Sequence, residues 1–562
     1  MTASYNESRL SEYKFDFVVA VTQGSINATM KTFLSSKPEP ELKICYVAEI
    51  DPSTSQVVPK EIEFAKLLEL TAGVDPFTVD IPSSNPETDR NFQMLLKAKF
   101  MAGFKAQMGV PAAADLTKVP DIVGLRGDSA AVDYHLVCSE FTIAALQNEW
   151  GSYSWMRKSQ DPNHPWLYSA TVDLRMGKVE ESAYSKLPEA VQKKIKNLSA
   201  SAFSIQQLLF DLSNAGLSSA ARIDGVEPGS ILEIILNRFF VSKYVAERRK
   251  IGAPMLGCAF VPHETDKSSL TLTDLNFSVN PYSGPPTTDP EIKKDQLNLN
   301  CLNYLCAVDK HVLPPPTRFP WNWLQTGDLS DHDGCVSINR NNIRDWLAPS
   351  IEQEAKKHCL RPKAYAKHHD GNVTKLYIEI YFGPEETPAV QCKDEGKTVL
   401  TLSYDGYSED SDPAGKIELK YKYTLNLDFV GSNIVIMQNI WVWYYAETLS
   451  ISNHDVVIDD LRTDTYPITV ADGQLVVGEA TGKLEHRANP LDRGSVADFF
   501  SRINDVVHNI QRQLNNLTSI QLAAIPISAM QGFVFPGGNT FTFKHAEFSK
   551  HQDLIAFIKY VS

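Results

Sequence analysis

The sequence predicts an α+β protein with two related halves, in which amphipathic helices lie against long, curled antiparallel sheets. Two observations support this prediction. Short patterns from the first half of the chain recur in the second half, and the second half contains long stretches of alternating apolar and polar residues. A recurring pattern indicates a repeated structural unit, and alternation with a period of two is typical of a strand with one buried face.

The recurring patterns lie near the start and near the end of each half. The segment 270–278 recurs as 541–549, apolar residue on apolar residue, at an offset of 271 (541 minus 270), and each copy follows a proline, Pro262 or Pro536. Near the two starts the offset is 317 (336 minus 19), and the matched residues are Val19, Val21, Ile26 and Met30 with Val336, Ile338, Ile343 and Leu347. The order start, end, start, end predicts internal duplication, with 46 additional residues (317 minus 271) in the first half.

One long strand is predicted at 417–429, where every second residue is apolar over 13 residues. This length is about twice that of a typical strand, so it predicts a large, curled antiparallel sheet with one face in water. Other β-rich segments lie at 376–382, 399–404 and 434–449, and turn sequences lie at 405–415, 431–432 and 472–473. Together these segments predict a meander of long strands.

A long amphipathic helix is predicted after the meander. Its apolar residues recur three and four positions apart: Val496, Phe499, Phe500, Ile503, Val507, Ile510, Leu514 and Leu517. Ser495 can cap its start, and it ends before Pro526. At the α-helical repeat this helix has about six turns. A further helix is predicted at 342–355, after the second start pattern.

The first half is predicted from shorter signals. Helices are expected at 25–34, 200–217 and 231–245, strands at 42–50, 92–104, 132–138 and 166–176, and either type at 62–70. The proline-rich segment 313–320 predicts a stiff, extended connector, which is followed by Trp321 and Trp323. We therefore expect a first module at 1–315, a connector at 316–330 and a second module at 331–562.

The composition of the 562 residues, 43% apolar and 22% charged, is that of a soluble globular protein. A net charge of -14 opposes a general attraction to nucleic acid, so no nucleic-acid partner is expected. The segment 1–15 lacks the pattern of a secretory signal, and no stretch is apolar enough to span a membrane. We therefore expect a cytoplasmic protein whose membrane contact, if any, is peripheral. The eight cysteines are scattered and are expected to be reduced, buried and apolar in character.

Residues of catalytic type do not combine into an active-site motif. The segments 331–333 and 368–370 contain histidine and aspartate, but they lie in turn sequences where such residues are common. His135 and Cys138 are an odd number of positions apart on a predicted strand, so their side chains face opposite sides. The pair 358–359 ends a helix, where the helix dipole favours a histidine. We predict no catalytic residue, no metal site and no cofactor.

The apolar residues therefore carry the functional prediction. A helix against a rolled sheet can enclose a tubular apolar interior, and burial of a lipid tail there contributes about 0.8 kcal/mol per CH₂. In the second half the predicted ligand-binding residues are Phe499, Phe500, Ile503, Val507, Ile510, Tyr421, Tyr423, Leu425 and Leu427. The alternative interpretation is that these side chains only form the protein core.

Several of these motifs resemble a known family. The motifs are Phe533-Val-Phe-Pro-Gly-Gly538 followed by 541–543, 548–549 and 553–560, the start pattern Val336-Ser-Ile338-Asn339-Arg340 with its helix, and the opening 15–20 with Ile26-Asn27. Together they resemble the tubular lipid-binding (TULIP) superfamily, in particular its clostridial-toxin-cluster branch. The resemblance implies two tandem TULIP-like modules, each a long helix wrapped by a highly curved antiparallel sheet. It also implies binding of a hydrophobic ligand or phospholipid rather than catalysis, and it identifies no residues for a lipid headgroup.

The sequence thus predicts a protein that binds or carries a lipid or another elongated hydrophobic ligand in a tubular apolar cavity. Two alternatives stay open. The same interior could belong to a cyclase or isomerase acting on a hydrophobic natural-product intermediate, because catalysis by shape leaves no motif. The chain could also be a component of a toxin-associated protein assembly, with Trp321 and Trp323 as its contact surface. The oligomeric state is not predicted.

Overall fold

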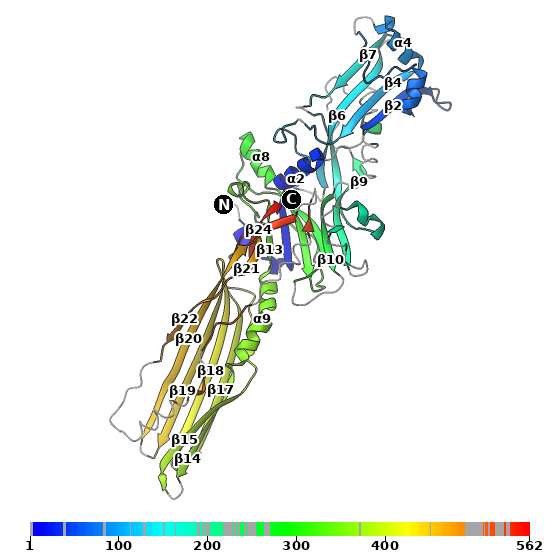
Figure 1. Ribbon diagram of the computed structural model, residues 1–562. Helices are drawn as coiled ribbons and strands as arrows, with labels where there is room; N and C mark the ends of the chain where they lie inside the picture. The colour runs from blue at the N-terminus through cyan, green and yellow to red at the C-terminus, as the bar shows by residue number, and fades with distance from the viewer. Residues whose placement is uncertain are drawn as a thin grey trace.

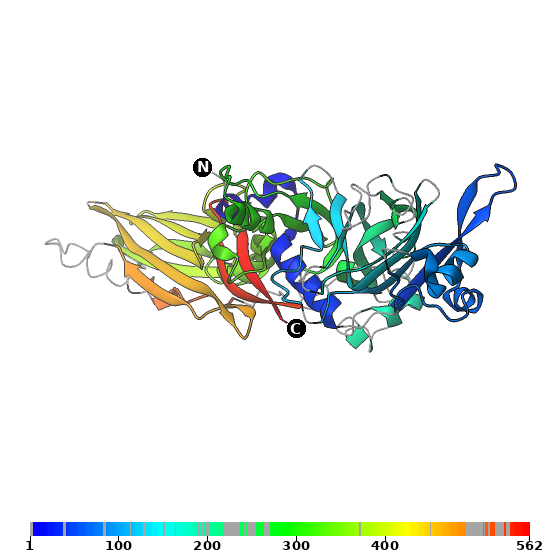
Figure 2. The same ribbon diagram turned by 90° about the horizontal axis from the view of Figure 1, so that it is seen from above.

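A computed structural model describes residues 4–36, 41–82, 86–112, 114–127, 131–149, 152–162, 165–187, 203–216, 236–240, 255–262, 270–369, 372–449, 451–488, 517–522, 533–535 and 540–561, together with residues 192, 193, 196, 229, 233, 243, 508, 510 and 512–514. Antiparallel strands dominate and helices are fewer, which agrees with the predicted α+β class. The molecule is elongated, and its first and last strands lie near the middle (Figures 1 and 2).

A central antiparallel sheet joins the two halves of the chain. Among the described residues it has six strands in the order β11–β12–β1–β13–β25–β24. Their bounds are β11 (Leu272–Asn280), β12 (Cys301–Val308), β1 (Phe17–Thr22), β13 (Gly334–Ile338), β25 (Leu554–Val561) and β24 (Thr540–Phe548). The first three strands come from the first half of the chain and the last three from the second half. Both predicted start patterns and both predicted end patterns therefore lie in one sheet.

The register of this sheet relates the two halves by a local two-fold axis. β1 pairs with β13, and Val19 lies directly opposite Val336, the residue that the offset of 317 makes its equivalent. The two end strands also share a bulge, since the register shifts at Thr273 in β11 and at Lys544 in β24. These bulges are 271 residues apart (544 minus 273), which is the offset found between the two end patterns. Such agreement supports the proposal of internal duplication.

Two aspartates make equivalent bonds in the two halves. Asp16 precedes β1, and its carboxylate accepts the backbone N–H of Val308 at 2.7 Å. Asp333 precedes β13, and its carboxylate accepts the backbone N–H of Tyr560, also at 2.7 Å. The two acceptors are 317 residues apart, as the start patterns are. Each aspartate thus ties the first strand of its half to the last strand of the same half.

The same aspartates also bind the opposite half through their backbone. The carbonyl oxygen of Asp16 accepts the backbone N–H of Asn339 at 2.9 Å, and that of Asp333 accepts the backbone N–H of Thr22 at 3.0 Å. Thr22 and Asn339 directly precede the helices α2 (Gln23–Ser36) and α9 (Arg340–Lys356). The start of each helix is therefore fixed by the other half of the molecule.

The first half forms a second antiparallel sheet. Its described strands follow the order β23–β10–β9–β8–β6–β4–β2–β3, and β5 and β7 also pair with β6. Their bounds are β2 (Glu41–Ile50), β3 (Val57–Ile62), β4 (Phe100–Met108), β5 (Val123–Leu125), β6 (Ala131–Glu149), β7 (Ser152–Ser159), β8 (Leu167–Lys178), β9 (Phe203–Gly216), β10 (Met255–Pro262) and β23 (Phe533–Val534). Helices described in this half include α1 (Leu10–Tyr13), α3 (Phe64–Leu70), α4 (Arg90–Lys97) and α8 (Pro290–Asn298). Strand β23 comes from the second half of the chain, and its Phe533 lies opposite Ala259 of β10.

Two predictions for the first half were wrong. The segment 200–217 was expected to be a helix because its apolar residues Ile205, Leu208 and Leu209 are three and four positions apart, yet its described residues form the strand β9. β9 buries side chains on both faces, since Ile205 lies in one apolar cluster and Leu208 in the main core, so its burial does not follow a period of two. The segment 92–104 was expected to be one strand, but it contains the end of α4 and the start of β4. Asp89 starts α4, because its side chain accepts two backbone N–H groups there.

The second half forms a long meander, as predicted. In the described part of this half the sheet has seven strands, in the order β16–β17–β18–β19–β20–β21 with β22 also paired to β20. Their bounds are β16 (Ala389–Cys392), β17 (Thr398–Asp412), β18 (Gly415–Val430), β19 (Asn433–Thr448), β20 (Ser452–Ala471), β21 (Gln474–Val477) and β22 (Thr481–His486). A separate hairpin consists of β14 (Leu360–His369) and β15 (Asn372–Glu385). Helix α9 runs beside this sheet, and the hairpin lies toward its far end (Figure 1).

The expected tryptophan surface at the connector was wrong. Trp321 and Trp323 are each only 1% exposed, and Phe319 stacks on Trp321 with ring centroids 4.9 Å apart. They form one apolar cluster with residues from both halves, including Phe15 and Phe557. Residues 319–324 therefore act as a core element under the central sheet and offer no contact surface through these rings.

Other predictions have mixed outcomes. Most of the predicted helix 495–517, including Phe499, Phe500, Ile503 and Val507, lies outside the described residues. Six of the cysteines with described side chains are buried, as expected, but Cys392 is exposed because it lies on the short strand β16. Within the part of the chain that the structure describes, no helix is both long and apolar enough to cross a membrane.

Candidate hydrophobic ligand site

Four of the predicted ligand-binding residues lie on the inner face of β18. Tyr421, Tyr423, Leu425 and Leu427 are all fully buried, and the residues between them face the other side of the sheet. On β17 their cross-strand neighbours are, in the same order, Gly406, Tyr404, Leu402 and Leu400. On β19 the neighbours are Val442, Ile440, Gln438 and Ile436. Alternation along the strand thus produces a continuous apolar band across three strands.

Helix α9 and the β14–β15 hairpin cover this band. The buried residues of α9 include Ile343, Leu347 and Ile351, which are four positions apart and therefore share one face of the helix. The hairpin contributes Ala364 and Ile380, among others. All of these residues belong to the same apolar core as the inner face of β18. The arrangement is a helix and a ribbon laid along a long sheet.

Two tyrosine hydroxyls sit within this apolar interior and are satisfied by polar partners. The hydroxyl of Tyr421 donates to the backbone carbonyl of His358 at the end of α9. The ring of His358 stacks on Tyr423 at 5.5 Å between centroids. Burial lowers the pKa of His358 and raises the pKa of both tyrosines above their ordinary value. At neutral pH these groups are therefore uncharged, which suits an apolar interior.

A polar chain crosses the interior at Gln438. The Tyr423 hydroxyl donates to the Gln438 Oε1 at 2.9 Å, and the Gln438 Nε2 donates to the backbone carbonyl of Thr518 at 3.0 Å. The next strand holds the same segment, since the hydroxyl of Tyr466 donates to the carbonyl of Ile520 at 2.7 Å. Residues 517–522 are thus bound along the inner face of β19 and β20. Sequence reasoning missed this role, although a glutamine at an inward position of an alternating strand is a usable signal.

An ion pair lies beside this segment. The Arg462 guanidinium contacts the fully buried Asp464 carboxylate at 2.8 Å, and the Ser519 hydroxyl donates to the same carboxylate at 3.0 Å. Arg462 also donates to the carbonyl of Leu517 at 3.3 Å. Charge is thus neutralised where the apolar band meets residues 517–519.

The structure brings together five of the nine predicted ligand-binding residues. Tyr421, Tyr423, Leu425, Leu427 and Ile510 are fully buried in one core. The other four, Phe499, Phe500, Ile503 and Val507, lie outside the described residues, so their place in the site stays a prediction.

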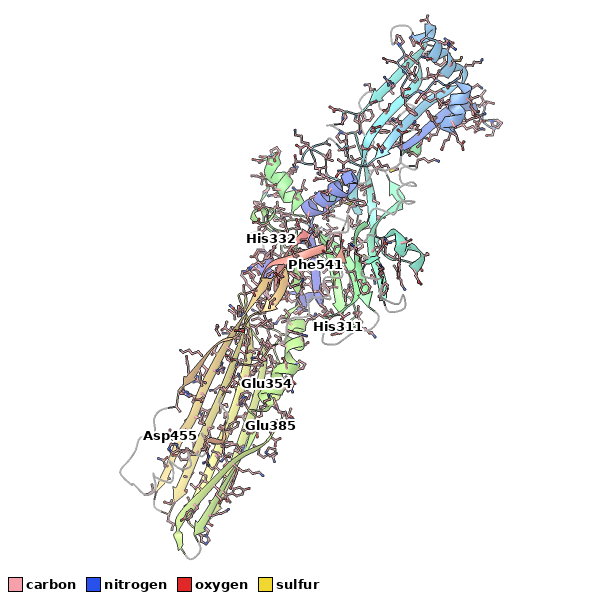
Figure 3. The ribbon with its side chains drawn as sticks, in the orientation of Figure 1. His311, His332, Glu354, Glu385, Asp455 and Phe541 are labelled. Atoms are coloured by element: carbon pink, nitrogen blue, oxygen red, sulfur yellow. The ribbon has the colours of Figure 1, made fainter. Side chains whose placement is uncertain are left out.

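The residues set aside as catalytic or metal candidates have structural partners. His368 pairs with Asp412 at 2.9 Å, and His135 contacts the backbone carbonyl of Asp121. Burial raises the pKa of Cys359 to about 12, so its thiol stays protonated at neutral pH. Figure 3 places His332 near the centre of the molecule, far from Asp455 on β20. No group of three metal-ligating side chains occurs among the residues that the structure describes.

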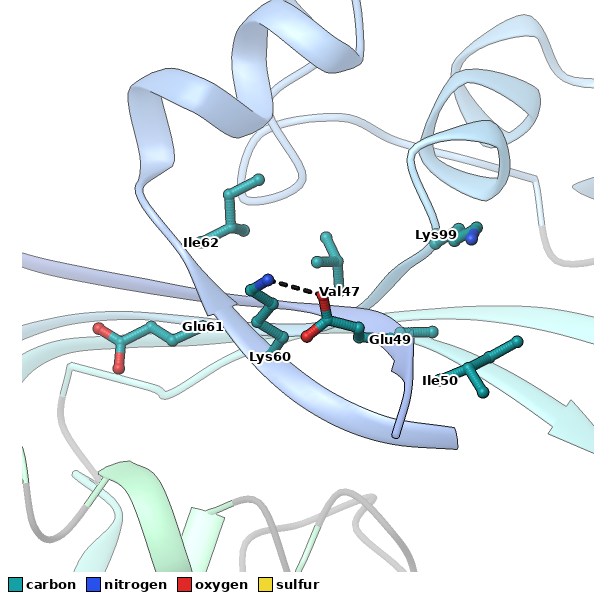
Figure 4. A pocket seen from close by; sticks show the side chains of 8 residues that line it. Val47, Glu49, Ile50, Lys60, Glu61, Ile62 and Lys99 are labelled. Atoms are coloured by element: carbon teal, nitrogen blue, oxygen red, sulfur yellow. Dashed lines mark hydrogen bonds and ion pairs between the residues drawn. The ribbon is translucent and has the colours of Figure 1, made fainter. Parts of the chain in front are cut away.

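A surface pocket lies in the first half, away from this interior. It has a volume of about 360 Å³ and is lined by Val47, Ala48, Glu49, Ile50, Lys60, Glu61, Ile62 and Lys99 (Figure 4). Across it, Lys60 pairs with Glu49 at 2.6 Å, and both side chains are about half exposed. The pocket is an open, mixed-charge groove on the β2–β3 hairpin and does not extend the apolar band.

Comparison with known proteins gives a likeness to solved structures. No protein-family description matches the chain, and no curated protein matches its sequence. Similar structures include P47 from Clostridium botulinum A2 (TM-score 0.45, 8% identity, 97% of each chain) and P47 of Clostridium botulinum E1 (TM-score 0.43, 8% identity, 97% of this chain and 98% of that one). A lipopolysaccharide binding protein is also similar (TM-score 0.25, 10% identity, 97% of this chain and 99% of that one). At such identities and TM-scores these likenesses establish neither a family nor a function.

Proposed function

We propose that this protein binds or carries an elongated hydrophobic ligand, such as a lipid, in the interior of its second half. The observation that carries the proposal is the continuous apolar band on the inner face of β17, β18 and β19, covered by α9. A ligand aligned with these strands would follow a mainly apolar surface, which is interrupted by the Gln438 side chain and the Tyr423 hydroxyl. The two-module organisation, with units at 1–315 and 331–562, is part of the same proposal.

The length of the strands supports an elongated ligand rather than a compact one. β18 and β19 each contain 16 residues. At about 3.4 Å per residue, a strand of this length spans roughly 50 Å. Because each buried CH₂ contributes about 0.8 kcal/mol, contact along even part of this length would hold an acyl chain without any charged group.

The polar groups of the interior also fit this function. The buried hydroxyls of Tyr421 and Tyr423 are already hydrogen-bonded within the protein, so a purely apolar chain beside them would leave no donor unsatisfied. The low pKa of His358 keeps a positive charge out of the interior at neutral pH. These features support storage or transport of a hydrophobic molecule, and they supply no reacting group.

The test combines extraction with ligand uptake. Purified full-length protein should release a hydrophobic species on solvent extraction, detected by mass spectrometry. The extracted protein should then bind a fatty acid carrying an environment-sensitive fluorophore, with saturation. Leu425→Gln, which puts a polar group on the inner face, should weaken this uptake several-fold.

Thr424→Gln is the matched control, because Thr424 neighbours Leu425 on β18 but faces outward. It should take up the probe as the parent does. Circular dichroism of both variants would establish that each is folded, and Leu425→Met should preserve uptake. Absence of any extracted species together with no saturable uptake would disprove the proposal, and so would equal uptake by the folded Leu425→Gln and Thr424→Gln variants.

A further inference from the structure

The β14–β15 hairpin lies against the second-half sheet without joining it. Among the described strands, β14 and β15 pair only with each other, so no backbone ladder links them to the meander. Their inward side chains, which include Ala364 and Ile380, belong to the same apolar core as β18. A backbone bond of 2.6 Å from the Glu386 N–H to the Cys359 carbonyl closes the base of the hairpin. We refer to β14 and β15 together as the ribbon, which forms one wall of the interior.

Side chains of β17 bind one edge of the ribbon. Three contacts, each between residues 44 positions apart, hold this edge: the Ala364 N–H donates to the Ser408 Oγ at 3.0 Å, the Ala366 N–H donates to the Asp410 carboxylate at 2.9 Å, and His368 pairs with the Asp412 carboxylate at 2.9 Å. We refer to these three contacts as the polar seam. On the opposite edge, the Gln513 Oε1 accepts the Phe382 N–H at 3.1 Å, and the Gln513 Nε2 donates to the Ile380 carbonyl at 2.7 Å. Side chains thus hold both edges of the ribbon.

The polar seam interrupts the apolar inner face of β17. Residues of this strand alternate between its two faces, and Leu402 is fully buried on the inner one. Further along the same face lie Ser408 and Asp410, although their cross-strand neighbours on β18, Leu419 and Ile417, are fully buried apolar residues. A permanent wall is built with apolar side chains at such positions. The polar side chains instead satisfy backbone N–H groups at the edge of β14.

A glycine on β17 lets the ribbon close against the sheet. A Cβ atom at Gly406 would lie 2.4 Å from the Cδ atom of Pro362 on β14, which is much closer than van der Waals contact. Because the proline ring is rigid, the ribbon itself would have to move away from β17. The close approach therefore requires a residue without a side chain at position 406.

The polar seam is easier to open than the backbone ladder beside it. Separation of β17 from β18 would break a ladder that runs from Thr398 to Asp412. Separation of β17 from the ribbon breaks three side-chain contacts, and water replaces them, because hydroxyl, carboxylate and N–H groups all bond to solvent. Little apolar surface is uncovered, since the inward side chains of β14 at the seam are small: Pro362, Ala364 and Ala366. Solvent already reaches this line, where the His368 side chain is 37% exposed.

We propose that the ribbon is a side gate: the polar seam opens to admit the hydrophobic ligand between β14 and β17, and it closes again over the bound ligand. Behind the seam the ligand meets the ring of Tyr421, which lies 5.6 Å from that of Phe382 on the ribbon. This inference rests on the proposed function, because it assigns an entry route to the same interior.

The first test locks the polar seam with a disulfide. Ala364→Cys is combined with Ser408→Cys in a chain that also carries Cys392→Ser, because Cys392 is an exposed thiol. Mass spectrometry shows whether oxidation joins the two new thiols. The oxidised lock should take up the fluorescent fatty acid at least tenfold more slowly than the reduced form in stopped-flow measurements, and dithiothreitol should restore the rate.

Thr424→Cys with Asn439→Cys is the matched control for the lock. These residues lie opposite each other on the outer face of β18 and β19, where a backbone ladder already joins the strands. Oxidation of this pair should leave the rate of uptake unchanged.

The second test wedges the polar seam open. Gly406→Ala should raise the rate of uptake several-fold, and without any ligand it should speed hydrogen exchange of residues 360–369. Gly327→Ala is its control, because a Cβ atom there meets nothing within 4 Å. This test decides the question if the lock does not oxidise, and the lock decides it if Gly406→Ala does not fold.

The two proposals fail in different ways. Saturable uptake that is equally fast in the reduced and oxidised lock overturns the gate and leaves the proposed function standing. Unchanged uptake and unchanged hydrogen exchange in folded Gly406→Ala also overturn the gate alone. A parent protein without saturable uptake removes the proposed function and the gate with it.

Discussion

The two halves of the molecule are alike in the central sheet and unlike in the arms that extend from it. In the centre, Asp16 and Asp333 make matching bonds, and the start strands meet at Val19 and Val336. In the arms, the first half carries α3, α4 and the β2–β3 hairpin, whereas the described part of the second half is a meander beside α9 and the β14–β15 hairpin. Strands β1 and β13 of the central sheet each have a neighbour from the other half, so the two halves must fit each other in register there. The comparison teaches that equivalence is strongest where the halves bind each other.

The largest expected effect comes from breaking the centre at Trp323. Its ring is buried in the cluster that joins both halves, so Trp323→Ala should lower the free energy of unfolding by about 3–5 kcal/mol. Urea unfolding followed by circular dichroism would measure the loss. Val312→Ala is the control, since Val312 is 92% exposed in the same connecting region and should change stability by at most about 0.5 kcal/mol. Similar effects of the two changes would contradict the buried connector.

A second experiment tests whether the centre is symmetric in energy as well as in geometry. Asp16→Ala and Asp333→Ala each remove the acceptor of one strand N–H, and each should cost about 1.5–3 kcal/mol. The two losses should agree within about 1 kcal/mol, as measured by urea unfolding. Asp80→Ala, at a side chain that is 96% exposed, should be nearly neutral. A large loss for one aspartate and none for the other would break the equivalence.

A third experiment uses a place where the symmetry fails. The residue directly before β25 is Asp553, which is fully buried and accepts the backbone N–H of Leu10 at 2.6 Å. In the first half the matching strand is β12, and it begins with Cys301, which has no carboxylate. Burial raises the pKa of Asp553 to about 6, above the value of about 3.9 in an unfolded chain. The folded state then holds its proton more tightly, so this group stabilises the fold below about pH 4, and the contribution is lost as the pH rises to about 6.

Asp553→Asn should remove this pH dependence. Relative to the variant, the parent should lose about 2–3 kcal/mol of unfolding free energy between pH 4 and pH 6. Urea unfolding at several pH values would measure the difference, and Cys301→Ser should leave the slope with pH unchanged. Parallel stability profiles for the parent and Asp553→Asn would show that the carboxyl does not titrate in this range.

The smallest expected effect lies on the outer face of the second arm. Lys420→Ala removes the ammonium group above Trp443 and should cost about 0.5–1 kcal/mol, because the contact is exposed to solvent. Thermal unfolding with fluorescence detection would record the shift, and Lys420→Arg should restore stability. A loss as large as that of Trp323→Ala would mean that the arm depends on its surface as strongly as the centre depends on its core.

Predictions from the sequence were reliable where one physical signal dominated. The segment 417–429 alternates strictly because one face of β18 is buried and the other is wet, so its type and its inner face were both predictable. The segment 200–217 was not, since β9 buries side chains on both faces and its apolar spacing imitates a helix. The inward positions of Tyr421 and Leu425 followed from alternation alone, whereas the link from Gln438 to Thr518 joins residues 80 positions apart.

What the sequence by itself determined is local: which strands have one apolar face, where the repeated start and end segments lie, and the absence of any familiar catalytic motif. Only the tertiary structure decided that both starts and both ends share one sheet, that Trp321 and Trp323 are core residues, and that Gln438 binds residue 518 across the interior. The physical reason is that periodicity records which side of an element is apolar, while its partner is chosen by packing and hydrogen bonds between distant segments.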